Sequence, residues 1–286
     1  MKVLVVGGSG FIGKHICLGI DADEIAYYSR SRSQELEARH IKWIPGSVLE
    51  AEKVALNVEK YDTIIDVAGV WDESQQKHMD VNVQGVKNIV SAIKNFDKDQ
   101  RLIYVSAINV DYGSDEYFRT RRIAEGNVNL VKNSAVVRPS VVFGNNSKIM
   151  EDLVKLARSP LKKLPDTGNL APVYVEDFVT VINKTMDFRG SMNVCSKEQI
   201  SLVSAVNAIR SEIGLNPLKG VSINPKKINK FLDKVSEKLP LSKDRINMLL
   251  LNYYRENTSL FRYVDNPVTF KGFVEQYAKT GGIDQD

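Results

Sequence analysis

The chain begins with residues whose types and spacing suit the binding of a phosphate group. An apolar run, Lys2 to Val6, leads into glycines at positions 7, 10 and 13, and the amphipathic stretch Lys14 to Ile20 follows. Three glycines at this spacing allow a tight turn, close approach of the backbone to a pyrophosphate, and close packing of helix on sheet. The free N–H groups and positive helix end then face an anion. We expect a dinucleotide phosphate at Gly7, Ser9, Gly10, Phe11, Ile12 and Gly13; a ligand-free tight turn is the alternative.

A second group of polar residues follows the next expected strand, Glu24 to Tyr28. In dinucleotide folds, an acid at this strand end holds the ribose hydroxyls of NAD, whereas an arginine accommodates the extra phosphate of NADP. The chain has no acid there and carries Ser29, Arg30, Ser31 and Arg32. Guanidinium groups alternating with hydroxyls suit charge-assisted bonds to a monoester phosphate. The sequence therefore predicts NADP over NAD, with a solvated basic loop as the alternative.

Composition and charge argue against several other classes of site. A chain of 286 residues with 43% hydrophobic content can bury a substantial core, and a net charge of +4 is too small for a nucleic-acid-binding surface. The histidines at 15, 40 and 78 lack metal-ligand spacing, so no metal is expected. Cys17 and Cys195 are expected to be buried free thiols. No apolar run suits a membrane span or a signal peptide, which predicts a cytoplasmic protein without direct membrane insertion.

The elements that must position these residues alternate between strands and helices. After the N-terminal strand, further strands are expected at 24–28, 41–44, 63–67, 102–105 and 135–137, with helices at 49–60, 81–94 and 117–131. The strand at 63–67 is apolar almost throughout, as is typical of a parallel strand covered on both faces. Sequential strands joined by helices form right-handed crossovers in one parallel sheet. The predicted fold class is therefore α/β, a doubly wound parallel sheet of the Rossmann type.

The regular alternation stops after Gly144, which predicts the boundary of a smaller lobe. Helices are expected at 149–158, 178–186, 202–213, 226–238, 241–254 and 267–279, the second of them capped by Asp177 and the third by Ser201. We assign residues 1–144 to a dinucleotide-binding domain, to which 172–200 would return. Residues 145–171 and 201–286 would form a smaller, mainly helical lobe that contacts a substrate or a partner.

Several further motifs together resemble the extended and atypical short-chain dehydrogenase/reductase superfamily, the group that contains nucleotide-sugar epimerases and dehydratases. The resemblance covers most of the chain. Beyond the glycines, it rests on Asp66-Val67-Ala68-Gly69, Asn82-Val83-Gln84-Gly85, Tyr117 with a basic residue four positions later, Ala124-Glu125, Arg138 to Gly144, and Val173 to Asp177. The segments Tyr117 to Arg121 and Tyr174 to Asp177 are most similar to the branch that holds the NADPH-binding accessory subunit of respiratory complex I.

The resemblance implies a set of catalytic residues from which this chain partly departs. The superfamily uses a tyrosine as general acid/base, a lysine that lowers the pKa of that tyrosine and holds the nicotinamide ribose, and a serine or threonine that polarises the carbonyl. Tyr117 matches the tyrosine, whereas Arg121 replaces the lysine and keeps its charge but not its reach. Ile108 stands where the serine usually lies, and Ser106 could substitute only if the loop were displaced. The catalytic candidates are Tyr117, Arg121 and Ser106.

The same resemblance implies cofactor contacts outside the glycine loop. Ser47, with Val48 beside it, stands where the superfamily commonly has an aspartate that bonds the adenine. The contacts implied at the other strand ends are Ala68, Gly69, Val70, Tyr117, Arg121, Pro139, Ser140 and Val141. Asn82 would either support the site from behind or cap a helix.

Two functions follow as expectations. The first is an NADP-preferring oxidoreductase or epimerase-like enzyme that transfers a hydride between the nicotinamide and a small carbonyl or alcohol substrate, with nucleotide sugars among the candidates. The second is a catalytically weak or inactive NADPH-binding structural or regulatory protein of the complex I accessory-subunit type, whose smaller lobe contacts a protein partner. The resemblance also allows a homodimer, and no nucleic-acid partner is expected.

Overall fold

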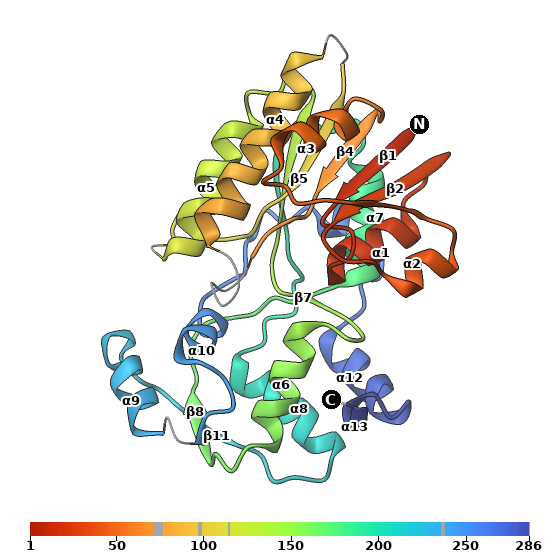
Figure 1. The fold of residues 1–286 in the computed structure, drawn as a ribbon. Helices are drawn as coiled ribbons and strands as arrows, with labels where there is room; N and C mark the ends of the chain where they lie inside the picture. Colours follow the sequence, from red (N-terminus) through yellow and green to blue (C-terminus); the bar gives the residue numbers. More distant parts are fainter. Residues whose placement is uncertain (71–76, 97–98, 114, 236–237, 286) are drawn as a thin grey trace. The chain divides into compact units, whose positions relative to one another are not determined.

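The computed structural model of the chain describes residues 1–70, 77–96, 99–113, 115–235 and 238–285 (Figure 1). These residues form two compact units. The first contains Met1–Pro139 and Phe178–Val194, and the second contains Ser140–Asp177 and Cys195–Asp286. The first unit ends at Pro139, before Gly144, because β7 (Val142–Phe143) pairs with β9 (Val173–Tyr174) inside the second unit.

The first unit is built on a seven-stranded parallel sheet, which confirms the predicted fold class. The strand order is β10-β6-β5-β4-β1-β2-β3, with bounds β1 (Lys2–Val6), β2 (Glu24–Ser29), β3 (Lys42–Pro45), β4 (Thr63–Asp66), β5 (Arg101–Val105), β6 (Ser134–Pro139) and β10 (Gly190–Val194). Because β1 pairs with β2 on one side and with β4 on the other, the chain order reverses beside β1. Open α/β sheets bind ligands outside the strand ends at such a switch point.

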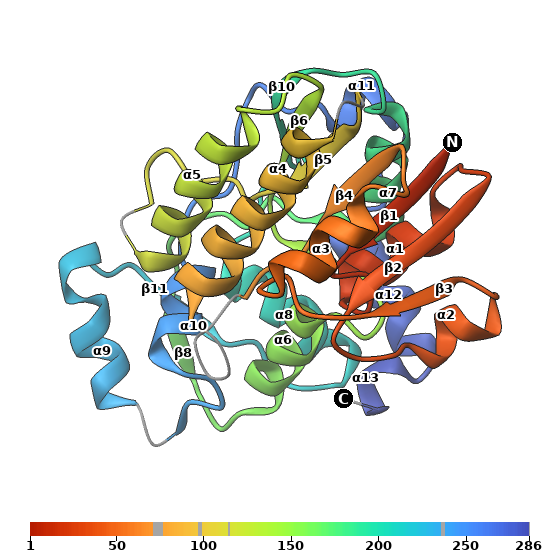
Figure 2. The ribbon, with the colours of Figure 1, turned by 45° about the horizontal axis from the view of Figure 1, so that its top comes forward.

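Helices cover both faces of this sheet, as Figures 1 and 2 show. The helical segments of the unit are α1 (Phe11–Gly19), α2 (Gln34–Ala38), α3 (Ala51–Val58), the π-helix η1 (Met79–Gly85), α4 (Val86–Asn95), α5 (Glu116–Val128) and α7 (Val175–Lys184), which enters it from the second unit. Alternate strand side chains such as Leu4, Ile64 and Tyr104 pack with α3, α4 and α5 in one apolar core. Helices α1 and α7 lie on the opposite face.

The second unit is mainly helical and has small two-stranded sheets. Its helices are α6 (Lys148–Arg158), α8 (Leu202–Glu212), the 3-10 helix η2 (Pro225–Lys227), α9 (Ile228–Lys234), α10 (Lys243–Leu249), α11 (Leu260–Tyr263), α12 (Phe270–Lys279) and α13 (Gly282–Gln285). Strand β8 (Lys163–Pro165) pairs with β11 (Lys219–Val221), parallel like β7 with β9. An aromatic cluster of Phe143, Tyr174, Phe270, Phe273 and Tyr277 joins β7, β9 and α12.

Two local expectations are wrong for identifiable reasons. Helix α7 begins at Val175, directly after β9, so Asp177 lies in its first turn and does not cap it; the carboxylate instead accepts a hydrogen bond from the Val268 N–H. Helix α10 ends at Leu249, well before residue 254, because the following backbone pairs with Asn169, whose carbonyl accepts from the Tyr253 N–H (2.7 Å).

Two further observations concern the thiols and the membrane. Cys17 and Cys195 are both free and buried, as predicted. Among the helices that the structure describes, none has both the length and the hydropathy needed to cross a bilayer.

Candidate functional site

The glycine-rich loop lies at the carboxyl end of β1, in the middle of the sheet. Gly7 has a φ of +83°, and a Cβ there would lie 2.8 Å from the Cα of Ala68. A Cβ on Gly13 would overlap the Gly7 carbonyl and lie 2.7 Å from the Cα of Gly8. Both positions therefore require glycine, the first for its backbone conformation and the second for close packing of α1. The turn therefore packs closely on the loop after β4, and α1 starts directly against the turn.

Helix α1 presents its N-terminus beside this loop. It begins at Phe11 after Gly10, with no side-chain hydrogen bond at the cap and no acid in its first turn. Ile12 is partly exposed, as is Phe11, whose ring meets the ring of His15 edge-on at 4.9 Å. The first N–H groups of a helix lack intrahelical partners, and the helix dipole adds positive charge there. The geometry therefore suits an anion.

The structure brings the basic loop after β2 to the glycine loop. The hydroxyl oxygens of Ser9 and Ser31 are 3.3 Å apart. Ser29 is buried and donates its hydroxyl hydrogen to the Ser31 carbonyl (2.7 Å), so it shapes the turn. The exposed residues of this loop are Arg30, Ser31 and Arg32.

Arg32 is held by two residues that the sequence reading did not single out. Its guanidinium lies over the Trp43 ring at 4.9 Å, and its Nε is 3.0 Å from a carboxylate oxygen of Glu37. Trp43 belongs to β3, and its indole N–H donates to the Ser29 carbonyl (3.1 Å). A tryptophan in the strand next to a basic loop is the sequence signal for such a stacked arginine.

Ser47 and Val48 follow β3 at the same edge of the sheet, and both are partly exposed. The Ser47 hydroxyl accepts from the Leu49 N–H (3.3 Å), and its carbonyl accepts from the Tyr28 hydroxyl (3.0 Å). The Val48 side chain packs against Gly85 of η1, where a Cβ would lie 2.6 Å from Val48 Cγ2.

The loop after β4 is supported from inside the unit. Asp66, the last residue of the strand, is buried, and its carboxylate accepts from the Ala68 N–H (3.0 Å). Burial raises the pKa of this carboxyl to about 7, although the Ala68 N–H and the charge of Arg121 act in the opposite direction. The Val70 N–H donates to the side chain of the fully buried Asn82 (3.1 Å).

Asn82 therefore supports the loop after β4 and does not cap a helix. It lies within η1, and its amide nitrogen donates to the Thr120 hydroxyl of α5 (3.2 Å). The side chain thus connects the loop after β4 to α5.

Tyr117 and Arg121 lie one turn apart on α5, as their spacing implies. Tyr117 is partly exposed; its ring lies 5.5 Å from the Arg121 guanidinium and meets the His78 ring edge-on at 5.8 Å. Arg121, only 6% exposed, is directed toward β5, where its Nη1 donates to the hydroxyl of buried Tyr104 (2.8 Å) and to the Val105 carbonyl (3.2 Å). The guanidinium is therefore bonded to the protein interior. Tyr104 and His78 were not among the candidate residues.

Ser106 and Ile108 pass along the end of β6. The Ser106 N–H donates to the Val137 carbonyl (2.8 Å) and the Ile108 N–H to the Pro139 carbonyl (2.9 Å). The Ile108 side chain is buried, and the buried Ser106 hydroxyl has no hydrogen-bond partner among the described residues. Ser140 and Val141 belong to the second unit, where the Ser140 hydroxyl donates to the Ala171 carbonyl.

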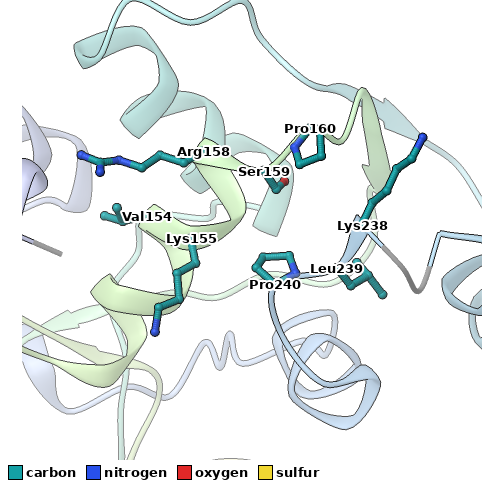
Figure 3. A pocket seen from close by; sticks show the side chains of 8 residues that line it. All are labelled: Val154, Lys155, Arg158, Ser159, Pro160, Lys238, Leu239 and Pro240. Carbon is teal, nitrogen blue, oxygen red and sulfur yellow. The ribbon is translucent and has the colours of Figure 1, made fainter.

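A hollow of about 420 Å³ lies in the second unit and contains none of these residues (Figure 3). It is lined by Val154, Lys155, Arg158, Ser159, Pro160, Lys238, Leu239 and Pro240. Lys155 and Lys238 are exposed, and Arg158 donates to the Ile283 carbonyl. Its basic side chains do not converge on one point (Figure 3), so the candidate site remains the sheet edge of the first unit.

Comparisons with known proteins agree with this fold. Residues 4–129 match the model of the 3-beta hydroxysteroid dehydrogenase/isomerase family. The chain is 26% identical over 260 residues to the 2-alkyl-3-oxoalkanoate reductase of Shewanella oneidensis, a match that covers 75% of this chain and 66% of that protein. It is 24% identical to the Dictyostelium discoideum NADH dehydrogenase [ubiquinone] 1 alpha subcomplex subunit 9, covering 54% of this chain and 46% of that subunit.

Solved structures extend the likeness of fold to nearly the whole chain. The enzyme WbmH of Bordetella bronchiseptica, solved in complex with NAD+, superposes with a TM-score of 0.75 at 13% identity, covering 98% of this chain and 97% of the other. The glycine loop at the switch point, the parallel sheet and the sequence matches agree: over residues 4–129 the chain is similar to the 3-beta hydroxysteroid dehydrogenase/isomerase family, and its fold is that of solved NAD-bound enzymes such as WbmH and the UDP-glucose 4-epimerase of Thermus thermophilus.

Proposed function

We propose that the chain binds a nicotinamide dinucleotide, NADP(H) in preference to NAD(H), and acts as an oxidoreductase on a carbonyl or alcohol. The observation that carries the proposal is the glycine turn at the carboxyl end of β1: Gly7 takes a positive φ, Gly13 lets α1 start directly against the turn, and the uncapped N-terminus of α1 lies beside it. The Gly7 to Gly13 loop would hold the diphosphate, and the Ser47–Val48 segment would lie beside the adenine. WbmH, whose fold this chain shares, was solved with NAD+.

The preference for NADP(H) is supported by the loop after β2. Arg30 and Arg32 are both exposed beside Ser31, whose hydroxyl lies next to Ser9 of the glycine loop. No carboxylate follows β2 before Glu35, so arginines stand at the strand end where an acid would hold the ribose hydroxyls of NAD. Of the two, Arg32 is paired with Glu37.

Tyr117 is the proposed proton donor. The chemistry that a bound, reduced nicotinamide would supply at this site is a hydride for a carbonyl carbon. The Tyr117 hydroxyl would give its proton to the carbonyl oxygen, so that the product is the alcohol. The curated relatives include a 3-oxoalkanoate reductase and 3-beta-hydroxysteroid dehydrogenases, whose names describe ketone and alcohol chemistry. Because the chain covers 66% or less of the length of these proteins, a ketone–alcohol substrate class is part of the proposal.

A binding protein without turnover is the second candidate. Arg121, in place of the superfamily lysine, bonds Tyr104 and Val105 in the interior, and Ile108 in the serine position is buried. The sequence likeness to a subunit of NADH dehydrogenase also favours this alternative.

The test of catalysis is a cofactor-consumption assay with ketones, aldehydes and sugar nucleotides on the wild type and on Tyr117→Phe. We expect the substitution to lower turnover about 100-fold or more and to leave NADPH affinity within about twofold, because it removes only the proton donor. Tyr112→Phe, at an 80% exposed position, is the control. Absence of turnover on the whole panel, with tight NADPH binding, would favour the second candidate.

The test of cofactor preference is calorimetric titration with NADPH and NADH. Replacing both Arg30 and Arg32 with alanine should weaken NADPH binding about tenfold or more and leave NADH binding unchanged, since only the former ligand carries the 2′-phosphate. Arg39→Ala, at the exposed C-terminal end of α2, is the matched control. Equal affinity of the wild type for both cofactors would refute the preference.

A further inference from the structure

The guanidinium of Arg121 fills a buried space between β5, α5 and the loop after β4. Its Nη1 donates to the Tyr104 hydroxyl and the Val105 carbonyl, and its Cζ lies 5.6 Å from the Tyr104 ring and 5.5 Å from the Tyr117 ring. A buried cation requires hydrogen bonds and a compensating charge. The buried carboxylate of Asp66 interacts electrostatically with it.

Gly69 leaves the room that this guanidinium occupies. A Cβ at position 69 would overlap Arg121 Nη2 and lie 2.8 Å from Cζ. The φ of Gly69 is not in the left-handed region, because the glycines with positive φ among the described residues lie elsewhere. Glycine at this position is thus explained by the arginine and not by the backbone.

The same loop continues to the phosphate loop. Ala68, next to Gly69, lies against Gly7 so closely that a Cβ on Gly7 would be 2.8 Å from the Ala68 Cα and N. Arg121, Gly69, Ala68 and Gly7 therefore form an uninterrupted series of contacts from α5 to the turn that we assign to the cofactor diphosphate.

We propose that Arg121 is a positioning residue for the phosphate loop, with Gly69 as its obligate partner, and that its guanidinium does not bind the nicotinamide ribose. The proposal rests on the proposed dinucleotide binding for its functional part. The replacement of lysine by arginine then has a role, because the longer, planar side chain reaches β5 and packs against the loop after β4 from inside the unit.

The experiment compares Gly69→Ala, Arg121→Lys and the double variant. In Gly69→Ala the new methyl group displaces the guanidinium and breaks its bonds to Tyr104 and Val105, so we expect a Tm lower by roughly 3–10 °C. Arg121→Lys removes the planar group. In the Arg121→Lys background, Gly69→Ala should therefore lower the Tm only slightly. Arg121→Met, which keeps the apolar stem, serves the same purpose if the lysine variant folds poorly. Gly126→Ala, on α5 with open space at its Cβ, should not lower the Tm.

Two ligands distinguish positioning from direct contact. NADPH contains the nicotinamide ribose, whereas 2′-phospho-ADP keeps only the adenosine half and the diphosphate. If Arg121 positions the phosphate loop, Gly69→Ala weakens the binding of both ligands by a similar factor, about tenfold. The affinities of the double variant should then lie within about twofold of those of Arg121→Lys. A purely local packing role would lower the Tm without changing either affinity.

Three outcomes would overturn the inference. Arg121→Lys or Arg121→Met could weaken NADPH and spare 2′-phospho-ADP, which would make Arg121 a ribose contact. Gly69→Ala could leave both Tm and affinity unchanged, which would mean that the guanidinium moves out freely. Affinity could also stay constant while the Tm falls. If the wild type binds neither nucleotide, the proposed function fails, and the rescue of the Tm by Arg121→Lys still decides whether Arg121 and Gly69 form a pair.

Discussion

Asp66 shows how a single carboxyl at a strand end links burial to pH. Burial raises its pKa from the ordinary value of 3.8 to about 7. The folded protein therefore binds an additional proton between about pH 4 and pH 7, so this group makes the free energy of unfolding fall as the pH rises through that range and level off above it.

We expect Asp66→Asn to remove this pH dependence, which amounts to a change in the free energy of unfolding on the order of 1–3 kcal/mol across the range. The amide oxygen can still accept from the Ala68 N–H, but the amide does not titrate. Urea unfolding of the wild type and the variant between pH 4.5 and pH 8 would measure it. Asp21→Asn, at an exposed position, should keep the wild-type slope. Parallel curves for the wild type and Asp66→Asn would contradict the assignment.

At the residue scale, the sequence specified the types of side chain at the site better than their directions. The glycines at 7 and 13 follow from spacing, because the turn at Gly7 needs a positive φ and Gly13 packs directly against Gly7 and Gly8. The direction of Arg121 depends on Tyr104, which is distant in the sequence and reads only as a core residue of an apolar strand. Nothing local distinguishes an arginine that faces a ligand from one that faces the interior.

At the scale of elements, η1 connects the loop after β4 to α5 through one amide. The side chain of Asn82 accepts from the Val70 N–H and donates to the Thr120 hydroxyl, and it is fully buried. Asn82→Ala leaves both partners without this bond, which should lower the free energy of unfolding by about 1–3 kcal/mol. Gln84→Ala, at an exposed position of the same helix, should change it by less than about 0.5 kcal/mol. Equal effects of the two substitutions, in chemical denaturation, would refute a role for the buried amide.

The elements of the first unit were predictable because their apolar patterns are strong. Strands β1, β4 and β5 are nearly continuous apolar runs, and α4 repeats apolar residues at helical spacing. Helix α2 was missed because five residues, QELEA, contain little apolar periodicity. The length of α10 was overestimated because the pairing with Asn169 that ends it is a tertiary contact.

At the scale of the whole molecule, each unit has its own core. Phe273 of α12 packs edge-on against Phe143 at 5.2 Å and stacks on Tyr277 at 5.3 Å, all within the second unit. Most candidate cofactor residues, by contrast, lie in the first unit. The sequence signalled this division through the end of the β-α alternation. The last strand of the sheet, β10, lies in the segment 172–200 that was expected to return to the first domain, and its place is set by tertiary pairing with β6.

We therefore expect Phe273→Ala to lower the free energy of unfolding by about 3–5 kcal/mol through the cavity that it creates, and to leave NADPH affinity of the folded protein within about twofold. Denaturant titration and calorimetry on the same sample would measure both quantities. Val268→Ala, at a 38% exposed side chain, should be close to neutral in both. A large loss of NADPH affinity in folded Phe273→Ala would show that the second unit's core contributes to the cofactor site.

The thiol of Cys17 lies beneath the glycine loop, close enough that a Cβ on Gly8 would be 3.2 Å from its sulfur. Burial raises the pKa of this thiol to about 12, so the nucleophilic thiolate is almost absent at neutral pH while α1 stays on the sheet. Alkylating reagents such as iodoacetamide can therefore modify Cys17 only during transient detachment of α1. The rate of Cys17 alkylation would therefore report how often α1 detaches from the sheet, and any ligand bound at the glycine loop should lower that rate.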